Sequence, residues 1–135
     1  LGPSEDLSDR EESGKRPMKN QKTLYSSADE WLRDYLSVVY WRWLGTRHVW
    51  CPQWWAHPEA VVRVEGMWRS WEKMRSADAA MGIASWFTDV ADPMMRELLS
   101  PDGPFKGCGP ERHRPRRETD MTLPAIPAPT SLTNV

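Results

Sequence analysis

Two cysteines and one histidine are the residues of this sequence whose types and positions best suit metal binding. Cys51, His57 and Cys108 each stand next to a proline or a glycine, which favours a turn. With either His48 or His113 as a fourth ligand, they could form a Cys2His2 zinc site that braces a small domain. The sequence has no Cys-x-x-Cys pair, however, and such tight pairing is what makes zinc motifs specific.

The simpler interpretation of these residues is structural. Both cysteines can serve as small buried hydrophobic residues, and His57 can cap a helix that begins at Pro58. A disulfide between Cys51 and Cys108 is a further alternative, which would require an oxidising compartment. The sequence therefore predicts no resident cofactor and leaves zinc as an alternative.

The sequence lacks the parts of an enzyme. A catalytic pair of Cys51 and His57 would need a lowered thiol pKa and a third group to orient the imidazole, and nothing in the sequence indicates either. Glu59, Glu65 and Glu72 lie along one predicted helix, where exposure to solvent is the common fate of a carboxylate. The sequence also contains no phosphate-binding glycine loop, Gly-x-Ser-x-Gly motif or His-Glu-x-x-His motif. We therefore expect that this protein is not an enzyme.

The elements that must position these residues are predicted to be helices. Ser27 and Glu30 form a capping box at the start of the first helix, which continues through Trp43 and ends at Gly45. Pro58 suits the first position of a second helix. The apolar stripe of this second helix consists of Ala60, Val61, Val64, Met67, Trp68, Trp71 and Met74.

Two shorter helices are predicted after residue 78. The third contains residues 81–90, and the fourth restarts with Asp92 as its cap and Pro93 as its first residue. Gly66 interrupts the second helix, either because another helix approaches it closely or because it is simply tolerated. Phe105 is expected to fold back onto the core. The sequence thus predicts an all-α fold, a small three- to four-helix bundle with a Trp-rich connecting loop and disordered tails.

Tryptophan supplies much of the predicted core. Nine of the 135 residues are Trp and only two are Phe. Each buried Trp removes about 150–250 Å² of surface from water, so a few of them can build a small core. The tryptophans that fall on apolar stripes, and are predicted to be buried, are Trp31, Trp43, Trp68, Trp71 and Trp86.

The predicted domain covers residues 25–108. Residues 1–24 are highly charged with few large apolar side chains, and residues 109–135 begin basic and end rich in proline, so both tails are predicted to be disordered. No apolar run approaches the roughly 20 residues of a membrane helix. The two cysteines do not form a disulfide framework, and we expect a cytoplasmic protein with reduced thiols.

The loop between the first two helices is the predicted partner-binding surface. Exposed Trp beside Arg is a frequent composition of binding hot spots, and the residues concerned are Trp50, Trp54, Trp55 and Arg47. The structural alternative is that these rings cover the ends of the small core. We expect the partner to be a protein.

Nucleic-acid binding is the alternative function. Basic residues on both sides of the domain could contact phosphates, while the loop tryptophans stack on bases. The formal net charge of −1 argues against a general attraction to nucleic acid. The basic residues concerned are Lys15, Arg16, Lys19, Lys22, Arg112, Arg114, Arg116 and Arg117.

Three stretches of the sequence are distinctive together: Trp-Cys-Pro-Gln-Trp-Trp-Ala-His-Pro-Glu-Ala (50–60), Met-Trp-Arg-Ser-Trp-Glu-Lys-Met-Arg (67–75) and Asp-Gly-Pro-Phe-Lys-Gly-Cys (102–108). Residues 30–108 resemble an actinobacterial family, domain of unknown function 4913, which tends to occur on plasmids, integrative elements and phages. The resemblance implies a bacterial cytoplasmic protein linked to mobile elements, and it implies no mechanism because the family has no established activity. Relatives often have His after the Asp-Pro of the last helix, whereas this chain has Met94. We expect a non-enzymatic accessory module.

Overall fold

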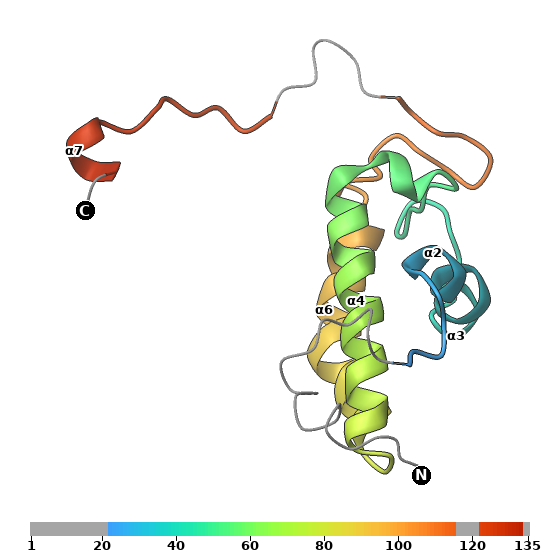
Figure 1. Cartoon of the computed structure of the whole chain (residues 1–135). Helices are drawn as coiled ribbons and strands as arrows, with labels where there is room; N and C mark the ends of the chain where they lie inside the picture. Colours follow the sequence, from blue (N-terminus) through green and yellow to red (C-terminus); the bar gives the residue numbers. More distant parts are fainter. Residues whose placement is uncertain (1–21, 116–121, 134–135) are drawn as a thin grey trace.

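The structure is a computed structural model that describes residues 22–115 and 122–133 (Figure 1). These residues are helical and contain no strand, only an isolated bridge between Gly109 and Arg112. The predicted helical class is confirmed. No helix in the described ranges is both long enough and apolar enough to cross a membrane. The elements are α2 (Ala28–Trp31), η3 (Leu32–Leu36), α3 (Ser37–Val39), η4 (Trp54–Ala56), α4 (Pro58–Ala77), α5 (Gly82–Trp86), η5 (Phe87–Ala91), α6 (Asp92–Leu99) and α7 (Thr130–Thr133).

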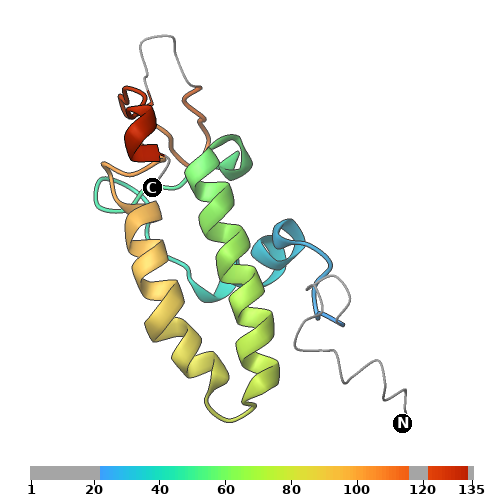
Figure 2. The same ribbon diagram turned by 60° about the vertical axis from the view of Figure 1, so that its left-hand side comes forward.

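Three helical segments make up the body of the fold. The elements α2, η3 and α3 follow one another without a break, and so do α5, η5 and α6. The second of these segments lies antiparallel beside α4, and α2 packs against α4 from another side (Figures 1 and 2). Because the two long segments are antiparallel, the start of α4 and the end of α6 lie at the same end of the molecule.

The first helical segment begins as predicted but ends early. Ser27 accepts a hydrogen bond from the backbone N–H of Glu30 at 3.1 Å, and the Glu30 carboxylate accepts one from the N–H of Ser26 at 2.8 Å. The segment ends at Val39 and not at Gly45, so that prediction is wrong. The segment also contains a π-helical turn, η3, and the backbone leaves the helical conformation at Tyr40. Trp43, predicted to be buried, is 81% exposed.

The third and fourth predicted helices are one continuous segment, and the prediction that Asp92 caps a new helix is wrong. Asp92 has helical backbone angles, and its N–H donates to the carbonyl of Phe87, five residues earlier. This π-helical turn, η5, ends at Ala91, two residues before Pro93, which cannot donate to the preceding turn. The Asp92 carboxylate instead accepts a 2.7 Å hydrogen bond from the Tyr40 hydroxyl.

Tryptophans form the centre of the core, as predicted for four of the five. Trp31 and Trp86 are fully buried and meet edge to face with ring centroids 5.8 Å apart, and Trp68 and Trp71 are also buried. The indole N–H of Trp86 donates to the carbonyl of Met67 and to the hydroxyl of Ser70, both at 3.0 Å. Trp86 therefore fixes the distance between α4 and the α5–α6 segment.

Helix α4 begins at Pro58 as predicted, and two glycines at α4 and α5 have opposite environments. A Cβ added at Gly66 would meet no atom within 4 Å, so simple tolerance explains this residue. A Cβ added at Gly82 would overlap the backbone carbonyl of Met74. The chain reverses between α4 and α5 because this close approach is possible only without a side chain.

The Gly66→Ala variant is expected to be more stable than the wild type by about 0.5–1 kcal/mol, because Ala has less conformational freedom to lose in a helix. Gly82→Ala is the matched control and is expected to lose about 1–3 kcal/mol, because the backbone must move to admit the methyl group. Urea denaturation of both variants checks this pair. Equal effects of the two substitutions would contradict the packing described for Gly82.

Glu72 anchors the start of the domain. It was predicted to be exposed to solvent, and that prediction is wrong. Its side chain is almost fully buried on α4. The N–H groups of Leu24 and Tyr25 donate to its two carboxylate oxygens, each at 2.9 Å, and Arg75 and Trp68 donate as well, at 2.8 and 3.1 Å. Burial alone would raise the pKa of Glu72, but these hydrogen bonds outweigh burial and hold its pKa below the ordinary value.

We expect Glu72→Gln to destabilise the protein by about 2–3 kcal/mol at pH 7, because an amide cannot accept all of these hydrogen bonds. Since the folded state lowers the pKa of Glu72, this stabilisation is present above the ordinary value of 4.5 and is lost as the pH falls through the folded value. Urea melts between pH 3 and pH 7 should therefore converge for variant and wild type at low pH. Glu65→Gln is the control: Glu65 pairs with Arg69 at 2.9 Å but on the exposed surface, so its loss should cost less than about 0.5 kcal/mol. A pH-independent difference for Glu72→Gln would contradict the assignment.

Candidate metal centre and exposed tryptophan surface

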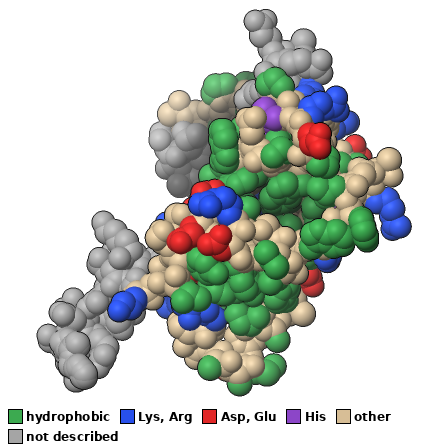
Figure 3. Space-filling model, turned by 90° about the vertical axis from the view of Figure 1, so that its right-hand side faces the viewer, with side chains coloured by type: hydrophobic (Ala, Val, Ile, Leu, Met, Phe, Trp, Pro, Cys, Tyr) green, Lys and Arg blue, Asp and Glu red, His purple; other side chains and the backbone are tan. Residues whose placement is uncertain are grey.

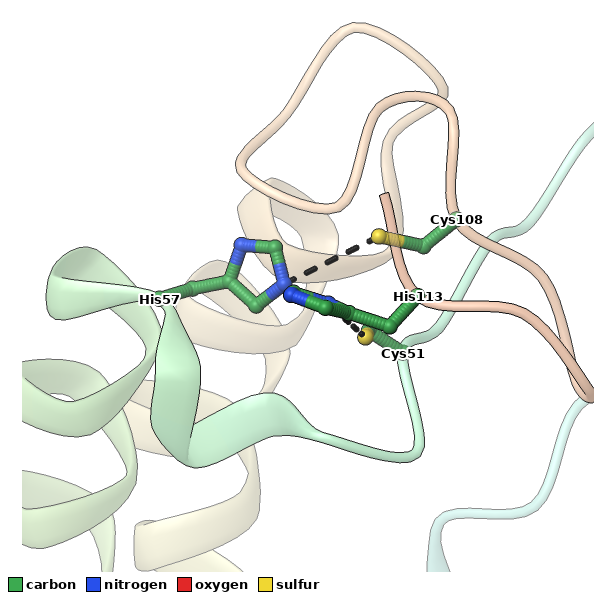
Figure 4. Close-up of side chains that lie close together, drawn as sticks. All are labelled: Cys51, His57, Cys108 and His113. Carbon is green, nitrogen blue, oxygen red and sulfur yellow. Dashed lines mark hydrogen bonds between the residues drawn. The ribbon is translucent and has the colours of Figure 1, made fainter. Parts of the chain in front are cut away.

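Two cysteines and two histidines meet at the end of the molecule where α4 starts and α6 ends (Figure 4). Cys51 lies in the loop before η4, and His57 stands directly before α4. Cys108 and His113 follow α6, in the turns after it. The antiparallel arrangement of the two long helical segments therefore brings one Cys–His pair against the other.

The possible ligand atoms of these four residues all lie within 4.8 Å of one another. The sulfur of Cys51 is 3.1 Å from Nδ1 of His113, and the sulfur of Cys108 is 3.7 Å from Nε2 of His57. Figure 4 shows both imidazole rings and both sulfurs pointing toward one small volume. Both cysteines are free thiols, so the disulfide weighed as an alternative is not formed in this structure.

Burial shifts the pKa of two residues of this cluster, Cys51 and His57. Cys51 is fully buried and Cys108 is 7% exposed, whereas the two histidines are half-buried. Burial, followed by a hydrogen bond with the Cys108 side chain, raises the pKa of Cys51 to about 11. Burial also lowers the pKa of His57, and the charge of His113 lowers it further. Without a bound ion, Cys51 is therefore a neutral thiol and His57 a neutral imidazole at pH 7.

Successive turns carry Cys108 and His113 back to the core. The N–H of Cys108 donates to the carbonyl of Phe105, and Gly109 and Arg112 exchange two backbone hydrogen bonds. Gly107 has φ of +88°, a conformation that favours glycine. Phe105 is fully buried, as expected, and its ring meets the His57 ring edge to face at 4.9 Å.

Backbone groups surround the cluster with further hydrogen bonds. The N–H of Arg114 donates to the sulfur of Cys108 at 3.3 Å, and the backbone of Gln53 hydrogen-bonds to Cys51. The backbone of Pro104 hydrogen-bonds to the His57 ring. Because proline has no N–H, its carbonyl must accept this hydrogen bond from the ring. Such contacts orient ligands in metal sites.

The structure brings together the three predicted candidates, Cys51, His57 and Cys108, and of the two possible fourth ligands it selects His113 and not His48. The His57 side chain makes no capping hydrogen bond to α4. Five residues separate Cys51 from His57, and four separate Cys108 from His113. These two short and similar Cys–His spacings are the sequence signal that a search for Cys-x-x-Cys misses.

The predicted partner surface is only partly exposed. Trp54 is 8% exposed and belongs to the core, so its ring is not available to a partner. Trp50 is half-buried against Phe105, with ring centroids 4.8 Å apart. Trp55 and Arg47 are exposed, as that prediction requires. Whether they bind a partner stays a prediction.

Two other tryptophans are exposed, and one of them, Trp41, lines an apolar groove. Trp41 and Trp43 are 55% and 81% exposed, and their rings meet edge to face at 4.6 Å. Trp41 and Leu44 border a groove of about 130 Å³ whose floor is formed by the first helical segment and α6. On the face that carries α2 and α3, hydrophobic side chains gather into a broad patch (Figure 3). The other residues around the groove are Leu32, Leu36, Ser37, Tyr40, Arg42, Trp50, Met95 and Leu99.

The basic residues of the nucleic-acid alternative are only partly described. Lys22 is exposed, and Arg112 donates to the carbonyl of Gly107 at 3.0 Å. The Arg114 side chain lies against Gly107. The fold therefore continues past the predicted boundary at Cys108, through residues that were expected to form a disordered tail. The remaining basic residues, which lie outside the described parts of the chain, are Lys15, Arg16, Lys19, Arg116 and Arg117.

The fold and the cluster define a small helical domain whose two Cys–His pairs converge at one end of an antiparallel helix pair. Residues 25–129 match the family "Domain of unknown function (DUF4913)", and the chain belongs to this family. The matched region includes all four residues of the cluster and the exposed tryptophans Trp41 and Trp43. No curated protein and no solved structure matches the chain.

Proposed function

We propose that this protein is a non-enzymatic accessory module that binds a protein partner through the groove beside Trp41 and Trp43. The observation that carries the proposal is the exposure of these two large rings next to an apolar groove. Exposed apolar surface of this kind costs free energy in water and is typical of interaction sites. In this proposal the three helical segments act as a bundle that supports the loop of residues 40–50.

The charge around the groove favours a partner segment that is apolar and acidic. Arg42, Arg47 and Arg96 are exposed and lie beside the groove or in the adjoining depression around Tyr40 and His48. The Arg42 guanidinium stacks over the Tyr40 ring at 4.4 Å, which keeps a cation at the edge of the groove. A helical or extended peptide with large apolar residues and flanking carboxylates would complement both features.

Nucleic-acid binding is the second candidate, because exposed Trp and Arg side chains also suit stacking on single-stranded bases. The groove favours a protein. Its lining is mostly apolar, and bases joined by charged phosphates would leave it less well filled than aliphatic side chains. A single-stranded oligonucleotide therefore belongs in the same binding experiment as a competitor.

The proposed cellular role of this protein follows from its resemblance to the family. We propose that the module acts in the bacterial cytoplasm, in the maintenance, transfer or regulation of an actinobacterial mobile element such as a plasmid or phage. A partner encoded by the same element is the simplest source of a matching acidic and apolar segment.

The proposal is tested with peptides selected from a displayed library of random 16-residue sequences on the full-length protein. Selected peptides should combine large apolar residues with Asp or Glu. Trp43→Ala should weaken their binding about tenfold or more, because buried tryptophans dominate such interfaces. Arg47→Glu should weaken binding further as the acidic residues lose their counter-charge.

Trp55→Ala is the matched control: Trp55 is 60% exposed and does not line the groove, whereas the ring of Trp43 meets the ring of Trp41, which does. Its replacement should leave peptide binding unchanged. Peptides that bind the Trp43→Ala protein equally well, or that depend on Trp55 alone, would overturn the proposal. Binding only to single-stranded DNA or RNA, with a steep salt dependence, would replace it with the nucleic-acid alternative. Self-association abolished by Trp43→Ala would identify the occupant as a second copy and also overturn it.

A further inference from the structure

We infer that Cys51, His57, Cys108 and His113 bind one zinc ion in a closed tetrahedral site that is structural and not catalytic. This inference is independent of the proposed partner surface, because the cluster and the groove are formed by different side chains. It rests on the convergence of two sulfur and two imidazole ligands from four separate positions in the chain.

The geometry requires only a small contraction. Zinc binds sulfur at about 2.3 Å and imidazole nitrogen at about 2.0–2.1 Å, so the donors of a tetrahedral Cys2His2 site lie about 3.3–3.8 Å apart. The four ligand atoms here are within 4.8 Å of one another, and two of the pairs are at 3.1 and 3.7 Å. Closing the widest pair by about 1 Å and opening the 3.1 Å pair slightly would give these spacings.

The charges also balance. Two thiolates and two neutral imidazoles give Zn2+ a neutral site, which suits the buried position of Cys51 and Cys108. Binding converts two thiols to thiolates and releases their two protons to solvent. The N–H of Arg114, which donates to the sulfur of Cys108, would stabilise the thiolate after that proton has left.

The ligand set indicates both the metal and the role. Tetrahedral S2N2 coordination is typical of zinc among the metals available to proteins. Four protein ligands leave no open position for water or substrate, which is typical of structural sites. The ion would join the segment before α4 to the turns after α6. At this end of the molecule the chain consists mainly of loops and turns. The ion would also hold residues 109–114 against the core, because these residues have few apolar side chains of their own to do so.

The test is the zinc content of the full-length wild-type protein, purified without chelators. Zinc is measured by inductively coupled plasma mass spectrometry and by native mass spectrometry. One zinc per chain is expected. Modifying both thiols with a mercurial reagent should release that zinc to a coloured indicator in step with thiol loss. This second measurement needs no variant and therefore does not depend on whether a mutant folds.

His113→Gln and His48→Gln form a matched pair of variants. His113→Gln should weaken zinc binding about 100-fold or more, since even residues behind the ligands change affinity 10–100-fold. His48→Gln should retain the wild-type affinity, because His48 is outside the cluster. A folded protein that holds no metal, an iron or copper ion in place of zinc, a disulfide between Cys51 and Cys108, or equal zinc loss in the two variants would each overturn the inference.

Discussion

Removing the metal with a strong chelator is expected to lower the melting temperature of the protein by about 15 to 30 °C. When free zinc exceeds its dissociation constant a thousandfold, binding to the folded state alone contributes about 4 kcal/mol. The loss should be large because the site ties together segments that have little other cohesion. Cys51 and Cys108 lie in loops, and the described turns before His113 are held by short-range hydrogen bonds such as those between Gly109 and Arg112. Calorimetry or circular dichroism before and after chelation measures the effect.

Two controls separate this effect from nonspecific damage by the chelator. Adding zinc back in slight excess should restore the original melting temperature, while adding magnesium should not, because Mg2+ prefers oxygen ligands. The His48→Gln protein should respond as the wild type does. A melting temperature that does not change when zinc has been removed would show that the ion, if bound, does not stabilise this fold.

The second large effect is expected for Trp86→Ala, which should destabilise the protein by about 3–5 kcal/mol. Trp86 is fully buried, touches the rings of Trp31 and Phe87, and donates to both Met67 and Ser70. Its removal leaves a cavity between α4 and the α5–α6 segment, which the surrounding rings can fill only in part. Urea denaturation followed by far-ultraviolet circular dichroism gives the change in the free energy of unfolding.

Trp43→Ala is the matched control for that experiment, because it also replaces one indole by a methyl group. Trp43 is 81% exposed, so the free energy of unfolding should change by less than about 0.5 kcal/mol. Trp86→Phe should fall between the two, since it keeps most of the ring volume and loses the hydrogen bonds. A large loss of stability in Trp43→Ala would contradict the described position of residues 40–45.

The parts of the fold that depend on local chemistry could be predicted from the sequence. The Ser27 cap and the start of α4 at Pro58 are fixed by a few neighbouring residues, and both predictions are confirmed. The two π-helical turns η3 and η5 could not be predicted, because an inserted residue leaves the apolar spacing before it unchanged. Trp43 was wrongly assigned to the core because the helix ends at Val39, before Trp43, and Asp92 was wrongly assigned to a cap because the helix continues through η5 and Asp92.

The candidate metal centre shows the same division. The residue types indicated possible ligands, but their convergence depends on the antiparallel packing of two segments that are far apart in sequence. His113 could not be preferred over His48 without that packing, since it lies beyond the predicted domain. Glu72 is similar: its partners Leu24 and Tyr25 come from the other end of the domain, so the helical pattern alone placed it on the solvent side.

X-ray absorption at the zinc edge of the purified full-length protein tests the central claim most directly. The account predicts four ligands in the first coordination shell, two sulfurs at about 2.3 Å and two nitrogens at about 2.0–2.1 Å. A shell made only of oxygen and nitrogen, or the absence of stoichiometric zinc at the edge, would contradict the assignment of Cys51, His57, Cys108 and His113 as its ligands.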